Sequence, residues 1–141
     1  MRLLLPILIL FVFSEIAPRV VAQDHANQTP TKRTTTYDEI AKAPAKARAK
    51  RNPLESDPDA IAAGRVLFEQ HCQECHGRSA DGAGRGPSLR VQEIQTAEPG
   101  AIFWIISNGV VRRGMPDWSK LPEPQRWALV CFIKSLGKKP S

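Results

Sequence analysis

The sequence predicts a small all-α domain in residues 57–141. Apolar side chains recur three and four positions apart, as on one face of a helix, in three stretches: residues 58–72, 99–107 and 125–136. Each stretch is bounded by residues that favour a helix end, namely Asp57-Pro58 before the first, Asn108-Gly109 after the second and Gly137 after the third. We therefore expect three helices joined by long loops.

The first 22 residues have the features of an export signal. Arg2 supplies a positive charge, residues 3–13 form an apolar core, and small residues before position 23 suit cleavage after Ala22. The eleven residues of this core are fewer than the roughly 20 needed to cross a bilayer. We expect residues 1–22 to be a cleaved signal peptide and the protein to be periplasmic. The alternative is an uncleaved membrane anchor, because residues 16–21 prolong the apolar character.

Residues 23–56 are polar and basic, and they predict a flexible linker. They hold seven Lys or Arg and four Asp or Glu, and few sizeable hydrophobic side chains, namely Tyr37, Ile40 and Leu54. Such a stretch buries too little surface to offset the entropy lost on ordering. Part of the net charge of +6 lies here. A basic run can indicate nucleic-acid binding, but an exported protein rarely meets nucleic acid, so we expect none. Membrane contact is expected only through the N-terminal segment or this linker.

The first and last predicted helices are expected to pack against each other. Gly64 lies inside the first helix, where it costs about 1 kcal/mol relative to alanine. A close approach by a second helix would compensate for this cost. We predict that the terminal helices cross at Gly64, with Phe68 packed against Leu129 and Phe132.

Immediately after the first helix comes the motif Cys72-Gln73-Glu74-Cys75-His76, which has the spacing of a c-type haem attachment site. On one helical turn the two thiols can each add to a vinyl group of the porphyrin, which brings the His76 imidazole under the iron. A zinc half-site and a thioredoxin-like redox pair are the alternatives. Zinc would need two more ligands at similar spacing, and no βαβ pattern surrounds the motif. We predict one covalently bound haem c, with His76 as an iron ligand.

From about Asp57 to Lys139 the sequence resembles a class I, monohaem, periplasmic cytochrome c domain. The resemblance rests on Gly64 and Phe68, Cys72-x-x-Cys75-His76, Pro87-Ser88-Leu89, Met115-Pro116, and Leu129 with Phe132. It implies a small cytochrome c fold, with terminal helices crossing near the haem, a short middle helix and long loops around the cofactor. It also implies that the Pro87 carbonyl accepts a hydrogen bond from the His76 ring and that Leu89 covers the haem edge.

Met115 is the expected second iron ligand. Once Met1 leaves with the signal peptide it is the only methionine, and it follows His76 by 39 residues, far enough to reach the opposite haem face. Gly114 and Pro116 suit a loop that approaches a ring closely and is then held rigid. Thioether ligation favours reduced iron and so raises the potential. The alternative is a methionine in the hydrophobic core.

Two further sets of residues have weaker assignments. Arg112, Arg113, Trp104 and Trp118 are candidates to contact the haem propionates, and equally candidates for surface charge or core packing. Cys131 falls off the apolar stripe of the last helix, and we expect Trp127 and a neighbouring loop to shield it. A disulfide-linked dimer is the alternative for this residue.

With both axial positions of the iron filled, the predicted site can pass electrons but has no open position for a substrate. We therefore expect an electron carrier, not an enzyme, or the cytochrome subunit of a larger exported oxidoreductase. Its partners would be redox proteins such as a periplasmic dehydrogenase or a terminal oxidase. The alternatives are a peroxidase-like haem enzyme, which requires a labile Met115, and a haem sensor, for which no signalling domain is present.

Overall fold

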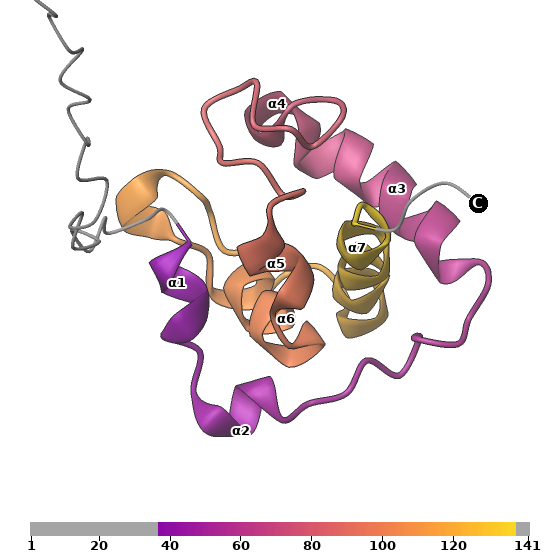
Figure 1. Ribbon diagram of the computed structural model, residues 1–141. Helices are drawn as coiled ribbons and strands as arrows, with labels where there is room; N and C mark the ends of the chain where they lie inside the picture. The colour runs from indigo at the N-terminus through magenta and orange to yellow at the C-terminus, as the bar shows by residue number, and fades with distance from the viewer. Residues whose placement is uncertain (1–36, 138–141) are drawn as a thin grey trace, which may run out of the picture. The chain divides into compact units, whose positions relative to one another are not determined.

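The computed structural model describes residues 37–137, and within them every regular element is helical (Figure 1). In chain order they are α1 (Asp38–Ala41), α2 (Ala45–Arg48), α3 (Ala60–His71), α4 (Gln73–His76), α5 (Gln92–Thr96), α6 (Pro99–Asn108), the short 3₁₀ helix η1 (Val111–Arg113) and α7 (Glu123–Ser135). The all-α prediction is confirmed. In this described part no helix has the length and apolar character to cross a bilayer. The predicted signal peptide and residues 23–36 of the predicted linker lie outside the described residues.

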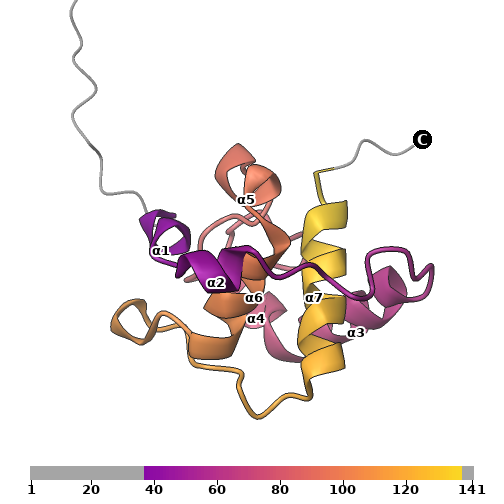
Figure 2. The ribbon, with the colours of Figure 1, turned by 90° about the horizontal axis from the view of Figure 1, so that it is seen from below.

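Helices α3 and α7 form the centre of the fold and cross at Gly64, as predicted (Figures 1 and 2). A Cβ added at Gly64 would overlap the Ala128 carbonyl oxygen and lie 2.9 Å from the Cβ of Phe132. The rings of Phe68 and Phe132 are 5.2 Å apart between centroids. Phe68 and Leu129 are 0% and 1% exposed. The two backbones therefore touch where only glycine leaves room.

Helix α3 begins at Ala60, two residues after the start predicted from Asp57-Pro58. The Asp57 carboxylate accepts a hydrogen bond of 2.9 Å from the Asp59 backbone N–H, and the Asp57 carbonyl accepts one from the Ala60 N–H. Asp57 thus organises a turn that leads into the helix, and it does not cap the first helical turn itself. The helix ends at His71, so Cys72 lies just beyond it.

The middle helix, α6, extends one residue past the predicted range and packs against α7. Of its predicted inward residues, Ile102 and Ile106 are buried, whereas Ile105 is only half-buried. Phe103 also faces the core, where its ring stacks on Trp127 with centroids 4.0 Å apart. Gly109 ends the helix with φ +67°, a conformation that favours glycine.

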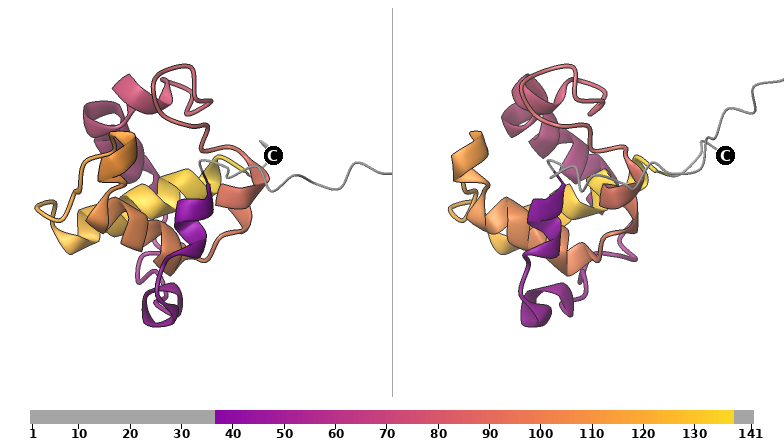
Figure 3. Two further views of the ribbon diagram at one scale, coloured as in Figure 1. Left: turned by 90° about the vertical axis from the view of Figure 1, so that its left-hand side faces the viewer. Right: turned by 60° about the vertical axis from the view of Figure 1, so that its left-hand side comes forward.

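In the structure, residues 37–56 are packed against the helical core, which differs from the flexible linker expected there. Figures 2 and 3 show α1 and α2 against the domain, with the chain continuing past α7 to α3. Ala43 is only 4% exposed. Opposite α2, a Cβ added at Gly100 of α6 would overlap the Ala47 carbonyl oxygen. Small residues on both sides let the backbones approach, and Tyr37, Ile40 and Leu54 are partly buried against the core.

A single buried polar side chain, Asn52, attaches the end of this segment to α7. Its Nδ2 donates to the Trp127 carbonyl at 3.1 Å, and its Oδ1 accepts from the Leu54 N–H at 2.9 Å. Its Nδ2 also lies 3.1 Å from the Sγ of Cys131, whose thiol lies 3.4 Å from the Leu54 carbonyl oxygen. The loop of Asn52 and Leu54 therefore contacts Cys131, but this residue is half-buried and lines a cavity, so the predicted shielding by a neighbouring loop is partial.

The short helix α5 was not expected, and it connects the loop of Leu89 to α7. The Gln95 side chain donates from Nε2 to the carbonyls of Leu89 and Ile133, at 2.7 and 3.0 Å. The Lys134 ammonium donates to the Ala97 carbonyl at 3.0 Å and also to that of Gln95. Burial of this ammonium lowers the pKa of Lys134. These bonds fix the chain that follows the attachment motif.

Candidate functional site

The Cys72–His76 motif forms a tight turn at the end of α3. Cys72 lies between the two helices, with φ −120° and ψ −32°, and Cys75 and His76 belong to α4. The backbone N–H groups of Cys75 and His76 both donate to the Cys72 carbonyl, at 3.1 and 3.0 Å. All three side chains are half-buried. The two thiols and the imidazole thus share one turn with partial access to solvent.

The His76 ring is held from its Nδ1 side. Its Nδ1 lies 2.8 Å from the Pro87 carbonyl oxygen, the contact that the family resemblance implied. When Nδ1 carries the hydrogen and donates it there, Nε2 keeps a lone pair for a metal. A Cβ added at Gly86 would lie 2.9 Å from this Nδ1. Gly86 is therefore needed for close approach to the ring.

The Cys72 thiol has an environment that favours its protonated form. Burial, with a smaller contribution from charge on the neighbouring Cys75, raises the pKa of Cys72 to about 11. A thiol–disulfide redox pair relies instead on an attacking thiol of lowered pKa, so the thioredoxin-like alternative is disfavoured. Among residues 37–137, no three His, Cys, Asp or Glu side chains are grouped so that they could hold a metal ion.

Met115 lies half-buried in a loop that is closed on itself by a pair of backbone hydrogen bonds. The Val110 N–H donates to the Met115 carbonyl at 2.9 Å, and the Met115 N–H donates to the Val110 carbonyl at 3.3 Å. Gly114 makes the turn with φ +87°, in the left-handed region that favours glycine. The sequence environment of Met115 thus produces a defined tight turn.

The same loop returns to the attachment motif through Trp118. The backbone N–H of Trp118 donates to the Ile106 carbonyl at 3.0 Å. The centroid of the Trp118 ring lies 5.1 Å from the centroid of the His71 ring. His71 directly precedes Cys72, and Trp118 follows Met115 by three residues. The fold therefore brings the chain around Met115 next to the chain around Cys72, and it gives Trp118 a packing role.

Of the remaining predicted site residues, Leu89 lies at the edge of the core. It is half-buried, packs against the core cluster, and its N–H donates to the Ala80 carbonyl at 2.8 Å. Two cavities of about 360 and 390 Å³ lie in the described part of the chain, one beside Cys131 and the other beside Tyr37. Neither cavity is lined by any predicted haem-site residue.

Two relatives are similar to this region of the chain. Quinohemoprotein alcohol dehydrogenase ADH IIB of Pseudomonas putida is 31% identical over 86 residues, which are 60% of this chain and 12% of that protein. The cbb3-type cytochrome c oxidase subunit CcoP of Azospirillum sp. (strain B510) is 27% identical over 96 residues, or 61% of this chain and 32% of the relative. This chain thus matches less than a third of each protein's length.

A solved structure supports the fold independently. The crystal structure of cytochrome cL from Methylophaga aminisulfidivorans MPT superposes with a TM-score of 0.53 at 27% identity, over 60% of this chain and 58% of that one. The family described as cytochrome c oxidase, cbb3-type, subunit III matches residues 59–133, from the start of α3 almost to the end of α7. The match covers more than half of the sequence, and the chain belongs to this family of cytochrome c domains.

Proposed function

We propose that this protein carries one haem c, bonded through Cys72 and Cys75 with His76 and Met115 as iron ligands, and that it transfers single electrons. The family implies covalently bound haem c. The assignment of these four residues is our own inference from motif and geometry. When bound, the cofactor supplies an iron centre that exchanges one electron. The chain's own residues set how the cofactor is held and how accessible its iron is.

The observation that carries this proposal is the orientation of His76. Its Nδ1 contacts the Pro87 carbonyl at 2.8 Å, with Gly86 leaving room for the ring. A histidine that binds a metal through one nitrogen commonly donates from the other to a carbonyl or carboxylate, which fixes its orientation and raises its basicity. His76 is thus preorganised for ligation, and the half-buried thiols of Cys72 and Cys75 lie on the same turn. This donor set fits a covalently attached haem.

Met115 decides between an electron carrier and an enzyme. The hydrogen-bonded turn between Val110 and Met115 supports a fixed second ligand, because it restricts where the thioether can go. If His76 and Met115 both held the iron, no position would remain for a substrate, and this favours electron transfer over peroxidase-like chemistry. The contrary case, in which Met115 dissociates readily, predicts rapid binding of small ligands by the wild-type protein.

We further propose that the protein works in the periplasm with a larger oxidoreductase. The names of two relatives are those of a quinohaemoprotein dehydrogenase and of a cytochrome oxidase subunit, and this chain matches 12% and 32% of their lengths. A dehydrogenase that releases electrons or an oxidase that takes them up would be a suitable partner. Residues 1–22 supply the expected export signal. Fractionation of the native host, followed by immunodetection, would test this location.

Covalent attachment is tested by denaturing electrophoresis followed by haem staining of the exported protein. We expect stain at the mass of the mature chain. Cys72→Ala/Cys75→Ala should lose the stain completely, whereas the matched variant Cys131→Ala should keep it. Colour that migrates as free haem from the wild-type protein would refute the proposal.

A further inference from the structure

Helix α1 packs against α6, although it precedes the family match, which begins at residue 59. Tyr37 and Ile40 are partly buried against the core cluster, and Ala43 is 4% exposed. We refer to residues 37–43 as the α1 segment. Because it is fixed in place by apolar packing, its polar side chains can restrain whatever they contact.

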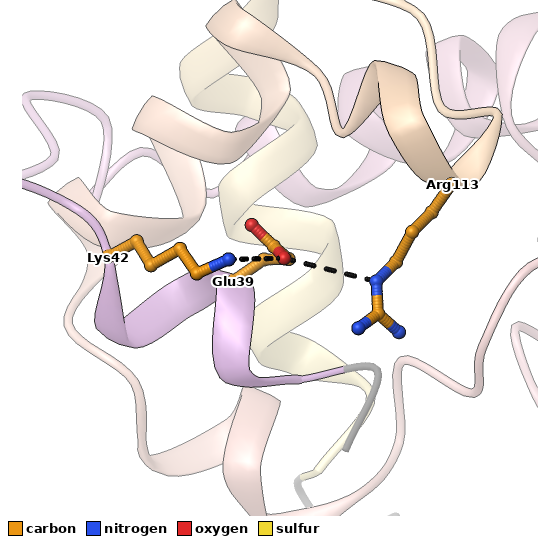
Figure 4. Close-up of polar contacts among 3 residues, drawn as sticks. All are labelled: Glu39, Lys42 and Arg113. Carbon is orange, nitrogen blue, oxygen red and sulfur yellow. Dashed lines mark hydrogen bonds and ion pairs between the residues drawn. The ribbon is translucent and has the colours of Figure 1, made fainter. Parts of the chain in front are cut away.

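One contact of the α1 segment is with the loop of Met115. The Glu39 Oε1 lies 2.7 Å from the Lys42 Nζ and 3.9 Å from the Arg113 Nε, so the carboxylate sits between the two cations (Figure 4). Arg113 ends η1 and precedes Met115 by two residues. The side chains of Glu39 and Arg113 are 22% and 37% exposed, against 62% for Lys42. The Glu39–Arg113 pair, which reaches the Met115 loop, is therefore less exposed than the Glu39–Lys42 pair.

A second contact of the α1 segment is with the chain around Pro87. Burial and the charge of Glu93 raise the pKa of Tyr37, and a hydrogen bond with the Ser88 backbone opposes this rise. Ser88 directly follows Pro87, whose carbonyl contacts the His76 ring. One short segment thus touches both the stretch that orients His76 and the loop that carries Met115.

In the described part of the chain, few contacts other than the pair with Glu39 hold the Met115 loop against the rest of the domain. A Cβ added at Gly114 would meet no atom within 4 Å, so the turn next to Met115 is open on that side. Beyond the paired bonds between Val110 and Met115, the contacts described for residues 111–114 are backbone bonds within the loop and the pair with Glu39. Glycine adds conformational freedom at this turn.

We propose that Glu39 is a positioning residue for Met115: through Arg113, it restrains the loop and keeps the thioether available to the iron. This inference rests on the proposed function, in which Met115 is an iron ligand. It gives residues 37–43 a role that the family match does not contain. Loss of the restraint should increase the fraction of protein in which Met115 is away from the iron.

Titration of the oxidised wild-type protein with imidazole, followed by absorbance, measures how readily Met115 is displaced. An exposed or partly exposed ion pair of this kind changes an equilibrium by about two- to fivefold. We therefore expect Glu39→Gln to bind imidazole about two- to fivefold more tightly than the wild type. The matched control is Lys42→Gln, which removes the other cation beside Glu39 and leaves Arg113; it should not tighten imidazole binding.

Charge reversal tests the pair directly. Glu39→Arg and Arg113→Glu should each tighten imidazole binding, and the double variant should return toward the wild-type affinity with an unchanged melting temperature. Equal affinities in the wild type and in Glu39→Gln, or no recovery in the double variant, would overturn the inference. Comparison with Met115→Ala distinguishes a failure of the Glu39 restraint from a failure of Met115 as an iron ligand. If the wild type binds imidazole as tightly as Met115→Ala, the ligand assignment fails as well.

Discussion

Replacement of Gly64 by alanine tests the central contact of the fold with a single methyl group. At the crossing of α3 and α7, the added Cβ would overlap the Ala128 carbonyl oxygen and lie 2.6 Å from its carbonyl carbon. Ordinary van der Waals contact begins at 3.4 Å, so the backbones must separate by at least 3.4 − 2.6 = 0.8 Å. A helix carbonyl cannot rotate away, and the strain must be relieved by moving a whole helix.

The magnitude follows from two opposing effects. Overpacking of a close contact costs typically 1–3 kcal/mol, and a backbone clash belongs at the upper end, about 3 kcal/mol. Alanine has a helix propensity better than that of glycine by about 1 kcal/mol, which offsets part of the cost. The net loss is about 2 kcal/mol, or a fall in melting temperature of about 8–16 °C for a domain of this size. Gly64→Val should cost more, because it adds two further methyl groups.

Thermal unfolding of the haem-loaded protein, followed by circular dichroism, is the assay. Ala63→Val provides a matched control, since it enlarges the neighbouring residue of the same helix at an exposed position. This control should change the melting temperature by no more than a few degrees. If Gly64→Ala melts at the wild-type temperature, the two helices do not meet at this residue and the reasoning is wrong.

Three other predictions concern single side chains. Met115→Ala should keep covalent haem but lower the potential and let the reduced protein bind carbon monoxide; a variant with the spectrum and potential of the wild type would exclude Met115 as a ligand. Asn52→Ala should lower the free energy of unfolding by about 1–3 kcal/mol, because it removes the buried hydrogen bonds of Asn52 with the Trp127 carbonyl and the Leu54 N–H; chemical denaturation measures this loss, and an unchanged midpoint would contradict it. Cys131, partly shielded by the Leu54 loop, should leave the protein monomeric on non-reducing electrophoresis, and a dominant dimer band that reductant removes would reverse this reading.

The central helices and the attachment motif could be predicted because their signals are local. Cys72, Cys75 and His76 are fixed by a five-residue spacing, and a glycine such as Gly64 inside a helical pattern directly indicates a close neighbour. The partner of that glycine was less predictable. The sequence pointed to the large side chains of α7, whereas the nearest atoms belong to the Ala128 backbone. Apolar periodicity identifies the face of a helix but not the carbonyl that approaches it.

The packing of residues 37–56 could not be predicted from hydrophobicity. Its anchors are a small residue, Ala43, and an amide, Asn52, neither of which contributes to an apolar pattern. Tyr37, Ile40 and Leu54 were the available signal, since large apolar groups in a polar stretch need somewhere to pack. The pairing of Glu39 with Arg113 likewise could not be predicted from the sequence, because it joins two charges that are 74 residues apart.

The crossing of α3 and α7 also has a consequence for the order of folding. Gly64 and Ala128 are 64 residues apart in the chain, and Asn52 and Trp127 are 75 apart. Closing a flexible loop of this length costs about 4 kcal/mol of chain entropy, which must be lost before the contacts that offset it can form. Of the described helices, α7 is synthesised last, so the core cannot close until the attachment motif has already been made. Refolding should accordingly be limited by this long-range closure and be slower than in helical bundles whose contacts are local.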